Sequence, residues 1–255
     1  MIDKYSESEL MVCCAAREIK NGETVFVGIG LPNIAVNLAK RVYAPGIKMI
    51  YEAGVFGADP RRLPLSIGDP CLVTDSTSIC SILDIFMFYL QRGLIDVGFL
   101  GGAQIDRFGN INSTVIGDYG SPTARLPGSG GACEIAILAK RVIIIIKQSK
   151  RSFAERVDFV TSPGFLGGDR DRENLRLPGT GPERVITDLG VYKFDPVSKE
   201  IILISLHPGV ETKKVRENTG WKIKISQDLK ITEEPTEEEI RILRQELDPK
   251  KIYLK

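Results

Sequence analysis

The chain has 255 residues and carries 34 Lys and Arg against 33 Asp and Glu, a net charge of +1. This balance excludes a general nucleic-acid binder, which needs a basic face, and 43% hydrophobic residues are typical of a soluble globular protein. The most apolar stretch, 79–90, is too short to span a membrane and contains Ser81 and Asp84. The N-terminus lacks the basic-then-apolar order of a secretory signal. We therefore expect a cytoplasmic protein with no membrane or nucleic-acid partner.

Cysteine and histidine usage narrows the chemistry further. The five cysteines are odd in number and form no CxxC motif, so we expect neither a disulfide framework nor a zinc site. His207 is the single histidine, which argues against His-based catalysis and against a multi-histidine metal centre. We therefore expect no metal, and any catalysis falls to carboxylates, lysines or backbone amides.

The first fifty residues predict a βαβ unit. Ser6 with Glu9 three residues later is typical of a capping box, and Gly22 ends the helix that it opens. Pro32 suits the first turn of a second helix, directly after a glycine turn. The expected elements are helices over 6–21 and 33–42 and apolar strands over 24–29 and 47–51. Because the two strands are separated by a helix, this order favours a parallel sheet.

The middle of the chain continues this alternation. Residues 78–91 predict a helix that is apolar almost all round, as in a core or at a subunit interface. Residues 142–146 (VIIII) form a continuous apolar run, typical of a strand covered on both faces. A strand over 96–100 and a helix over 132–140 complete this part.

The pattern changes after residue 151. Short strands are expected over 157–161, 184–188, 191–194 and 200–206. The stretch 163–182 is rich in Gly, Pro and charge, and we predict that it is an exposed excursion. Thr236 followed by Glu239 indicates a capping box that opens a helix ending near Leu247. Together these patterns predict a single α/β domain over 1–255, with a mostly parallel sheet flanked by helices and a strand-rich C-terminal half.

Glycine is concentrated in four turns next to the expected strands: Gly28/Gly30, Gly54/Gly57, Gly101/Gly102 and Gly128/Gly130/Gly131. In a parallel sheet, the loops after the strand carboxyl ends line the ligand crevice, and glycine lets a ligand approach free N–H groups. A dinucleotide fingerprint is rejected, because position 33, where GxGxxG needs its third glycine, is Asn.

Glu52 follows the apolar strand over 47–51 and precedes Ala53-Gly54, so we expect it at a strand end on the crevice edge. A carboxylate in that place can bind a cation, act as a base or act as a nucleophile. The alternative is a structural role as a helix cap or an ion-pair partner.

Five motifs occur in an order that resembles the second (β) subunit of class I CoA-transferases, and most closely the glutaconate CoA-transferases within that family. The motifs are GETVFVGIGLPNIAVNLAKRVYAP, YEAG, FLGGAQIDRFGNINST, PGSGGACEIA and VTSPGF. The resemblance extends from about Ser6 to the LDP near residue 248. Its specificity lies in the order and spacing of the motifs.

The resemblance implies that Glu52 is a catalytic nucleophile that transiently carries coenzyme A as a thioester. The family has a polar residue where this chain has Ala53. It further implies that Gly128, Ser129, Gly130 and Gly131 form an oxyanion and CoA-binding loop. Further crevice loops then contain Gly28, Gly30, Gly54, Gly101 and Gly102.

The implied enzyme transfers CoA between an acyl-CoA and a carboxylic acid, such as glutaconate or a related dicarboxylate, with no cofactor besides the CoA substrate. It works with a separate α subunit, in a heterotetramer or a larger assembly. Two alternatives stay open. One is a ring-opening hydrolase of CoA thioesters on the same scaffold, which SLHPGV (205–210) also resembles. The other is a non-catalytic partner of an active α chain.

Other polar residues have structural interpretations. We expect His207 to lie in a turn, and Asp106 and Asn110 to be turn formers whose side chains bond the backbone. Arg61-Arg62 and Arg125 can pair with a substrate carboxylate, although solvated surface roles are the ordinary alternative.

Overall fold

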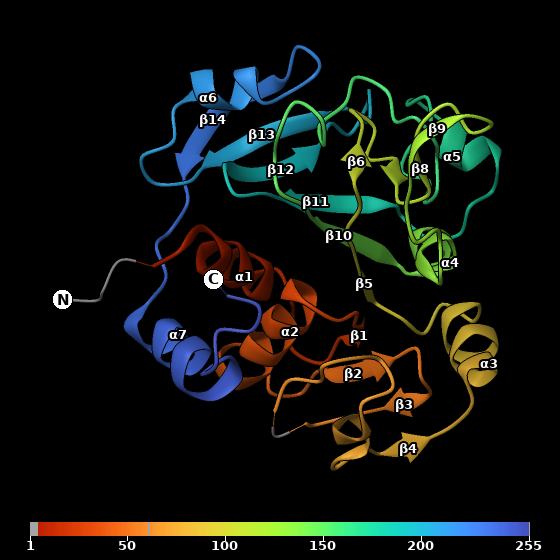
Figure 1. Ribbon diagram of the computed structural model, residues 1–255, viewed down its shortest axis with the longest axis vertical. Coiled ribbons are helices and arrows are strands. Elements are labelled where there is room, and N and C mark those ends of the chain that lie inside the picture. The colour runs from red at the N-terminus through yellow and green to blue at the C-terminus, as the bar shows by residue number, and fades with distance from the viewer. Residues whose placement is uncertain (1–4, 61, 255) are drawn as a thin grey trace. The chain divides into compact units, whose positions relative to one another are not determined.

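The computed structural model describes residues 5–60 and 62–254. Arg61 therefore lies outside the described residues. The chain packs into two compact units. Unit 1 extends to Phe99 and resumes at Glu234, whereas unit 2 is the continuous segment Leu100–Glu233. Each unit has its own strands and helices (Figure 1).

Unit 1 contains strands in the order β5-β1-β2-β3-β4. Their bounds are β1 Thr24–Phe26, β2 Lys48–Tyr51, β3 Val55–Phe56, β4 Ser78–Ile79 and β5 Val97–Leu100. Strand β1 runs parallel to both β2 and β5, while β3 and β4 add antiparallel pairs beyond β2. The predicted βαβ unit is therefore present, because α2 (Leu31–Val42) connects β1 to the parallel strand β2.

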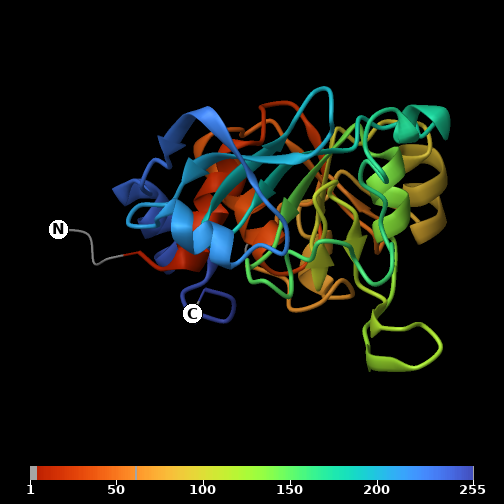
Figure 2. The ribbon, with the colours of Figure 1, turned by 90° about the horizontal axis from the view of Figure 1, so that it is seen from above.

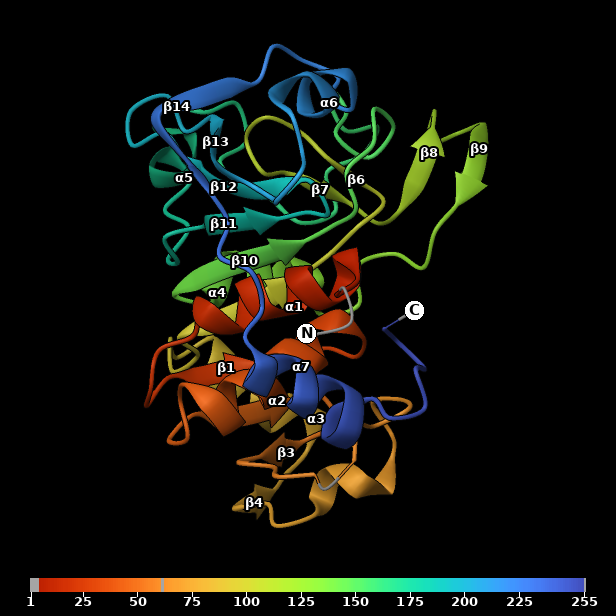
Figure 3. The ribbon, with the colours of Figure 1, turned by 90° about the vertical axis from the view of Figure 1, so that its left-hand side faces the viewer.

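The helices of unit 1 come from both of the chain segments that form it. They are α1 Glu7–Arg17, α2, the short 3-10 helix η1 Pro70–Val73, α3 Ile82–Asp84, the π-helix η2 Ile85–Leu90, α7 Glu237–Ile242 and the π-helix η3 Leu243–Leu247. Helix α1 packs against α2, and α2 contacts α7 and η3 (Figures 1 and 3). The capping boxes predicted at Ser6 and at Thr236 are both formed.

The apolar helix predicted over 78–91 begins later in the structure. Ser78–Ile79 instead pair with β3, and Ser81 caps the helix with Asp84 in a capping box. Several large apolar side chains of this helix face solvent: Ile82, Leu83, Met87 and Phe88 are all exposed. The helix is thus only partly a core element of unit 1.

The main-sheet strands of unit 2 have the order β14-β13-β12-β11-β10. Their bounds are β10 Arg141–Ile145, β11 Pro182–Ile186, β12 Gly190–Phe194, β13 Ile201–Leu206 and β14 Lys224–Ile231. The pairs β10–β11 and β13–β14 are parallel, and the two pairs formed by β12 are antiparallel. Its helices are α4 Ala132–Leu138, α5 Asp171–Asn174 and α6 Thr212–Glu217.

Two small hairpins precede α4 in unit 2. The first pairs β6 (Gln104–Ile105) with β7 (Ile111–Asn112), and the second pairs β8 (Val115–Gly117) with β9 (Pro122–Arg125). The second hairpin stands out from the rest of unit 2 (Figures 2 and 3).

The α/β class, the parallel strands flanked by helices and the strand-rich second half are confirmed. The strand predicted over 157–161 is wrong, because most of that stretch is exposed irregular chain. The chain packs as two compact units, and its description as a single domain over 1–255 stays a prediction. The excursion over 163–182 also stays a prediction: most of 169–180 is exposed, but Phe165 and Arg172 are buried. None of the described helices is long and apolar enough to cross a lipid bilayer.

Candidate active site

Glu52 lies in a tight turn at the carboxyl end of β2. The Gly54 N–H donates to the Tyr51 carbonyl oxygen at 3.0 Å, which closes the turn with Glu52 and Ala53 at its centre. The Glu52 side chain is partly buried and has no hydrogen-bond or ion-pair partner among residues 5–60 and 62–254. Neither structural alternative, a helix cap or an ion pair, is therefore present among these residues, and the carboxylate is available for chemistry.

Gly54 fixes the shape of this turn. Its φ is +104°, and a Cβ built on it would lie 1.9 Å from the Cys80 carbonyl oxygen, so only glycine fits. The Gly54 carbonyl oxygen accepts the Cys80 N–H at 2.8 Å and faces the Cys80 Sγ at 3.3 Å. Cys80 therefore clamps the turn that presents Glu52, a role that no motif in the sequence indicates.

Gly28 and Gly30 follow β1 at the same edge of the sheet. The register pairs Phe26 with Ile50 in parallel, so Gly28 and Glu52 each lie two residues beyond a paired position of neighbouring strands. A Cβ on Gly28 or Gly30 would meet nothing within 4 Å. Gly30 has a φ of +91° and is the N-cap of α2. This turn is open, unlike the packed turn at Gly54.

A buried amide network lies below the β2 edge. The Tyr51 hydroxyl donates to Asn33 Oδ1 at 3.5 Å, and Asn37 Nδ2 donates to the same oxygen at 2.7 Å. Burial raises the pKa of Tyr51 above its ordinary value, so it stays a neutral donor at physiological pH. These contacts join the start of α2 to the residue that precedes Glu52.

In unit 2, Gly101 and Gly102 lie where neighbouring chain segments leave little room for a side chain. A Cβ on Gly102 would lie 2.3 Å from the Ile111 side chain, and one on Gly101 would lie 3.1 Å from the Ile145 carbonyl oxygen. The Ala103 N–H then donates to the Asn112 carbonyl oxygen at 2.8 Å. Both glycines therefore let chain segments approach one another, and their predicted role in a ligand crevice stays a prediction.

The GSGG loop, residues Gly128–Gly131, has a different character. Gly128 and Gly130 have φ values of +95° and +49°, and added Cβ atoms would meet nothing within 4 Å. The backbone N–H groups of Gly130 and Gly131 have no acceptor within the described part of the chain. The Ser129 hydroxyl accepts the Cys133 N–H at 3.2 Å and so caps the start of α4. The loop thus presents two free donors to an open face.

The GSGG loop is anchored through Ser113. The Gly128 N–H donates to the Ser113 carbonyl oxygen at 2.8 Å, and the Ser113 hydroxyl donates back to the Gly128 carbonyl oxygen at 2.9 Å. The Ser113 N–H in turn donates to Thr161 Oγ1 at 2.9 Å. Because β7 ends at Asn112, the strand next to Gly102 is followed at once by Ser113, which is hydrogen-bonded to the GSGG loop. Unit 2 therefore brings these two glycine loops together through one short segment.

The remaining candidate residues have structural roles. Asp106 Oδ1 accepts the N–H groups of Phe108 and Asn110, and Asn110 Oδ1 accepts those of Gly164 and Leu166. Both residues are therefore turn formers, as predicted. His207 is also structural, because its ring is buried and hydrogen-bonded on both nitrogens.

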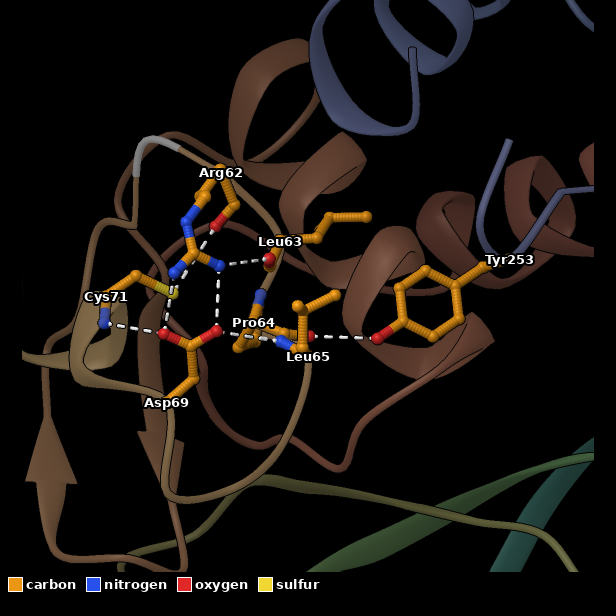
Figure 4. A network of polar contacts seen from close by, with 7 residues as sticks. All are labelled: Arg62, Leu63, Pro64, Leu65, Asp69, Cys71 and Tyr253. Atoms are coloured by element: carbon orange, nitrogen blue, oxygen red, sulfur yellow. Dashed lines mark hydrogen bonds and ion pairs between the residues drawn. The ribbon is translucent and has the colours of Figure 1, made fainter. Parts of the chain in front are cut away.

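Two of the arginines predicted as possible carboxylate binders, Arg62 and Arg125, already have partners within the chain. The Arg62 guanidinium donates to both Asp69 oxygens, at 2.7 and 2.8 Å, and this pair holds the loop that Tyr253 contacts at Pro64 (Figure 4). Arg125 donates to the Tyr119 carbonyl oxygen and lies over the Tyr119 ring. Within the described chain, no group of three or more His, Cys, Asp or Glu side chains is placed to hold a metal ion.

An unpaired carboxylate in a glycine turn can act as a nucleophile, and free N–H groups in a glycine loop can donate to an oxyanion. The chain belongs to the coenzyme A transferase family, whose model matches residues 9–218.

Three relatives define its place in that family. It is 52% identical over 240 residues to the B subunit of 3-oxoadipate CoA-transferase from Pseudomonas knackmussii, covering 94% of this chain and 92% of the relative. It is 40% identical over 255 residues to the B subunit of glutaconate CoA-transferase from Acidaminococcus fermentans, covering 98% and 95%. The crystal structure of that organism's glutaconate CoA-transferase matches 99% of this chain and 98% of its own with a TM-score of 0.93 at 38% identity. The cholesterol ring-cleaving hydrolase IpdB subunit of Rhodococcus jostii is 34% identical over 153 residues, 60% of each chain. The predicted family is confirmed.

Proposed function

We propose that this chain is the catalytic β subunit of an acyl-CoA:carboxylate CoA-transferase, with Glu52 as the nucleophile. One observation carries the proposal: the Glu52 carboxylate is partly buried, has no partner among the described residues, and lies in a turn that Gly54 and Cys80 hold rigidly. A carboxylate with an internal partner would lose nucleophilicity, whereas a rigid and unpaired one is ready to attack.

The proposed reaction is a double displacement. A Glu52 oxygen attacks the thioester carbonyl carbon, and the C–S bond breaks to leave an acyl-glutamyl anhydride and the CoA thiolate. The thiolate attacks the Glu52 side-chain carbonyl of the anhydride, which releases the first acid as a carboxylate and leaves a glutamyl-CoA thioester. A second carboxylate then repeats the two steps in reverse. No net proton transfer is needed, which agrees with a chain whose single histidine is structural.

Each displacement passes through a tetrahedral oxyanion that needs hydrogen-bond donors. We assign this role to the N–H groups of Gly130 and Gly131, because both lack an acceptor among the described residues and Gly130 lies on the open face of the GSGG loop. One such donor is typically worth about 3 kcal/mol of transition-state stabilisation. The Ser129 hydroxyl is already used as a helix cap, so we give it no role in the chemistry.

The proposed partner is a separate α subunit, because the names of the relatives of similar length describe B subunits. The exposed apolar side chains of the 82–90 helix support this, since isolated soluble chains rarely leave such a cluster uncovered. We propose a heterotetramer or a larger complex of the two chains.

The proposed acids are dicarboxylates. The names of the two relatives that cover most of this chain refer to 3-oxoadipate and glutaconate, which both carry two carboxyl groups. One carboxyl is then the reacting group and the other is available for recognition. The sequence match to the ring-cleaving hydrolase subunit has 34% identity over 60% of the chain, against 52% over 94% for the 3-oxoadipate CoA-transferase subunit, which favours transfer over hydrolysis.

Mass spectrometry of the complex with the α subunit tests the proposal. Incubation with acyl-CoA should attach CoA to Glu52, and borohydride should then reduce the thioester to an alcohol. Replacing a carboxyl group by CH2OH lowers the mass of the residue by about 14 Da. The Glu52→Gln variant and wild type without acyl-CoA should lack this mark, and Glu7→Gln, at an exposed helix position, should keep it.

The same experiment separates the alternatives. A mark on another residue, or normal transfer by Glu52→Gln, would show that Glu52 is not the nucleophile. Release of free CoA without transfer to an added acid would indicate a hydrolase. Full activity of the α subunit without this chain would indicate a scaffold.

A further inference from the structure

Arg172 is a buried arginine in the excursion 163–182, with only 5% of its surface exposed. Its guanidinium donates only to backbone carbonyl oxygens. Nε contacts Gly179 at 2.9 Å, Nη1 contacts Gly164 at 3.0 Å and Pro163 at 3.4 Å, and Nη2 contacts Ala136 at 2.8 Å and Ile137 at 3.4 Å. Five carbonyl groups from three separate segments therefore converge on one side chain.

No carboxylate compensates this charge within the described residues. Burial lowers the pKa of Arg172 to about 10, which leaves the guanidinium charged at physiological pH. Two of the five carbonyls, those of Ala136 and Ile137, belong to the last turn of α4, where helix carbonyls lack internal partners and carry partial negative charge. A buried cation that is costly to desolvate is thus held by the end of this helix.

The excursion is also tied to the β6–β7 hairpin. Asn110 Oδ1 accepts the N–H groups of Gly164 and Leu166, and Asn110 Nδ2 donates to the Leu166 carbonyl oxygen at 2.8 Å. A Cβ on Gly164 would lie 2.4 Å from the Phe108 carbonyl oxygen, so the two segments are in close contact. The start of the excursion is therefore fixed to the segment that follows Gly101 and Gly102.

The return of the excursion is fixed to the end of α4. The Gly179 N–H donates to the Ile137 carbonyl oxygen at 2.9 Å, and the Thr180 N–H and hydroxyl both donate to the Lys140 carbonyl oxygen. A Cβ on Gly179 would lie 2.1 Å from the Ala139 carbonyl oxygen, so glycine is required there. Helices α4 and α5 accordingly lie at the same end of the unit 2 strands (Figure 1).

We propose that Arg172 is a positioning residue for the GSGG loop: by holding the last turn of α4, it fixes the helix whose N-cap is Gly131. This inference rests on the proposed function, in which that loop binds the oxyanion. Helix α4 has seven residues, which corresponds to a length of about 10 Å. Since the GSGG loop has no packing contact on its open face, its placement depends on the helix that follows it and on Ser113 before it.

The test compares Arg172→Met and Arg172→Lys in the complex with the α subunit. Arg170→Met is the matched control, because Arg170 lies two residues earlier, is exposed and pairs only with Glu173 among the described residues. Hydrogen exchange is measured on peptides covering 128–140 and on peptides covering β14. Strand β14 is the reference because it lies at the opposite end of the unit 2 strand order from β10, the strand that follows α4. Steady-state kinetics give kcat and KM for the acyl-CoA.

We expect Arg172→Met to accelerate exchange over 128–140 by about tenfold or more and to leave β14 unchanged. A loop displaced from the oxyanion should lower kcat by about 10- to 100-fold and leave KM within about threefold. Lysine has a charge but no planar fork, so Arg172→Lys should lie between wild type and Arg172→Met. Arg170→Met should match wild type.

Unchanged exchange over 128–140 in Arg172→Met, or equal acceleration in β14, would overturn the inference. If Arg172→Met does not fold, Arg172→Lys decides by the same two peptides. A wild-type complex without transfer activity would count against the proposed function, while the exchange comparison would still decide whether Arg172 holds the loop.

Discussion

Arg17 and Glu239 form a bidentate ion pair across 222 residues of sequence, with Nε–Oε1 and Nη2–Oε2 distances of 3.1 and 2.7 Å. A second pair mirrors it: Arg244 contacts both carboxylate oxygens of Glu9, at 2.7 and 3.0 Å. Both glutamates are the third residues of capping boxes, in α7 and α1 respectively. Each carboxylate therefore closes the start of its own helix and binds an arginine of the other helical segment.

The fully buried Glu239 carboxylate should be important for stability. Glu239→Gln removes the buried carboxylate that contacts Arg17 at 2.7 Å, so we expect the free energy of unfolding to fall by about 3 kcal/mol in urea denaturation. The exposed neighbour is the control: Glu238→Gln should change this free energy by less than about 0.5 kcal/mol. Equal values for the two variants would show that the pair adds nothing.

His207 should make the stability of the protein depend on pH. Its Nε2 lies 2.7 Å from the Thr187 carbonyl oxygen, which can only accept, so Nε2 carries the proton and Nδ1 accepts from the Thr232 hydroxyl. Burial lowers the pKa of His207, although the Thr187 carbonyl opposes this shift. The unfolded chain therefore takes up a proton first as the pH falls below about 6.5, and the free energy of unfolding falls with it.

Urea denaturation at pH 7.5 and pH 5.5 measures this effect. Wild type should lose up to about 1 kcal/mol more than His207→Gln over this interval, because glutamine cannot titrate. Carboxylates titrate equally in both proteins and cancel in the difference. A difference between the two proteins that does not change with pH would contradict the prediction.

Gly54 and Gly28 offer a matched pair of glycine-to-alanine substitutions in unit 1. Gly54→Ala places a methyl group against the Cys80 carbonyl oxygen at a φ of +104°, so we expect it to lower the free energy of unfolding by about 2 kcal/mol or more. Gly28→Ala meets open space at an ordinary φ and should change it by less than about 0.5 kcal/mol. Chemical denaturation compares them, and equal costs would contradict the clamped turn.

The exposed apolar helix should bind the proposed α subunit. Phe88 is 63% exposed, and Phe88→Asp places a charge where association would desolvate it, so affinity for the α subunit should fall by at least about tenfold. Light scattering after size-exclusion chromatography of the mixed chains measures the assembly. Val197→Asp, at a 77% exposed position in unit 2, is the control and should assemble normally. Normal assembly by Phe88→Asp would place the interface elsewhere.

The sequence predicted the elements that depend on strong local signals. The capping boxes at Ser6 and Thr236 form at the predicted residues, and the strands predicted at 47–51 and 142–146 are present within one residue. The position of Glu52 at a strand end could be predicted from the strand and the turn alone. That it has no hydrogen-bond or ion-pair partner among the described residues could be seen only in the structure.

Features decided by distant contacts were missed. Strand β14 (KISQDLKI) has a polar and partly exposed pattern, and only its pairing with β13 makes it a strand. Arg172 lies in the charged run GGDRDRENLR, where nothing in the sequence distinguishes it from the exposed Arg170. Its burial follows from carbonyl groups of α4, some 36 residues earlier in the chain.

The pairing of Arg17 with Glu239 has a consequence for the order of events during synthesis. Unit 2 is a continuous segment and can close as soon as residue 233 is available, whereas unit 1 needs residues from both sides of that segment. Until α7 and η3 have emerged from the ribosome, Arg17 and Glu9 lack these partners, and the face of α2 that contacts α7 and η3 stays uncovered. The first part of the chain is therefore the last to become fully folded, and chaperones or proteases have the longest access to it.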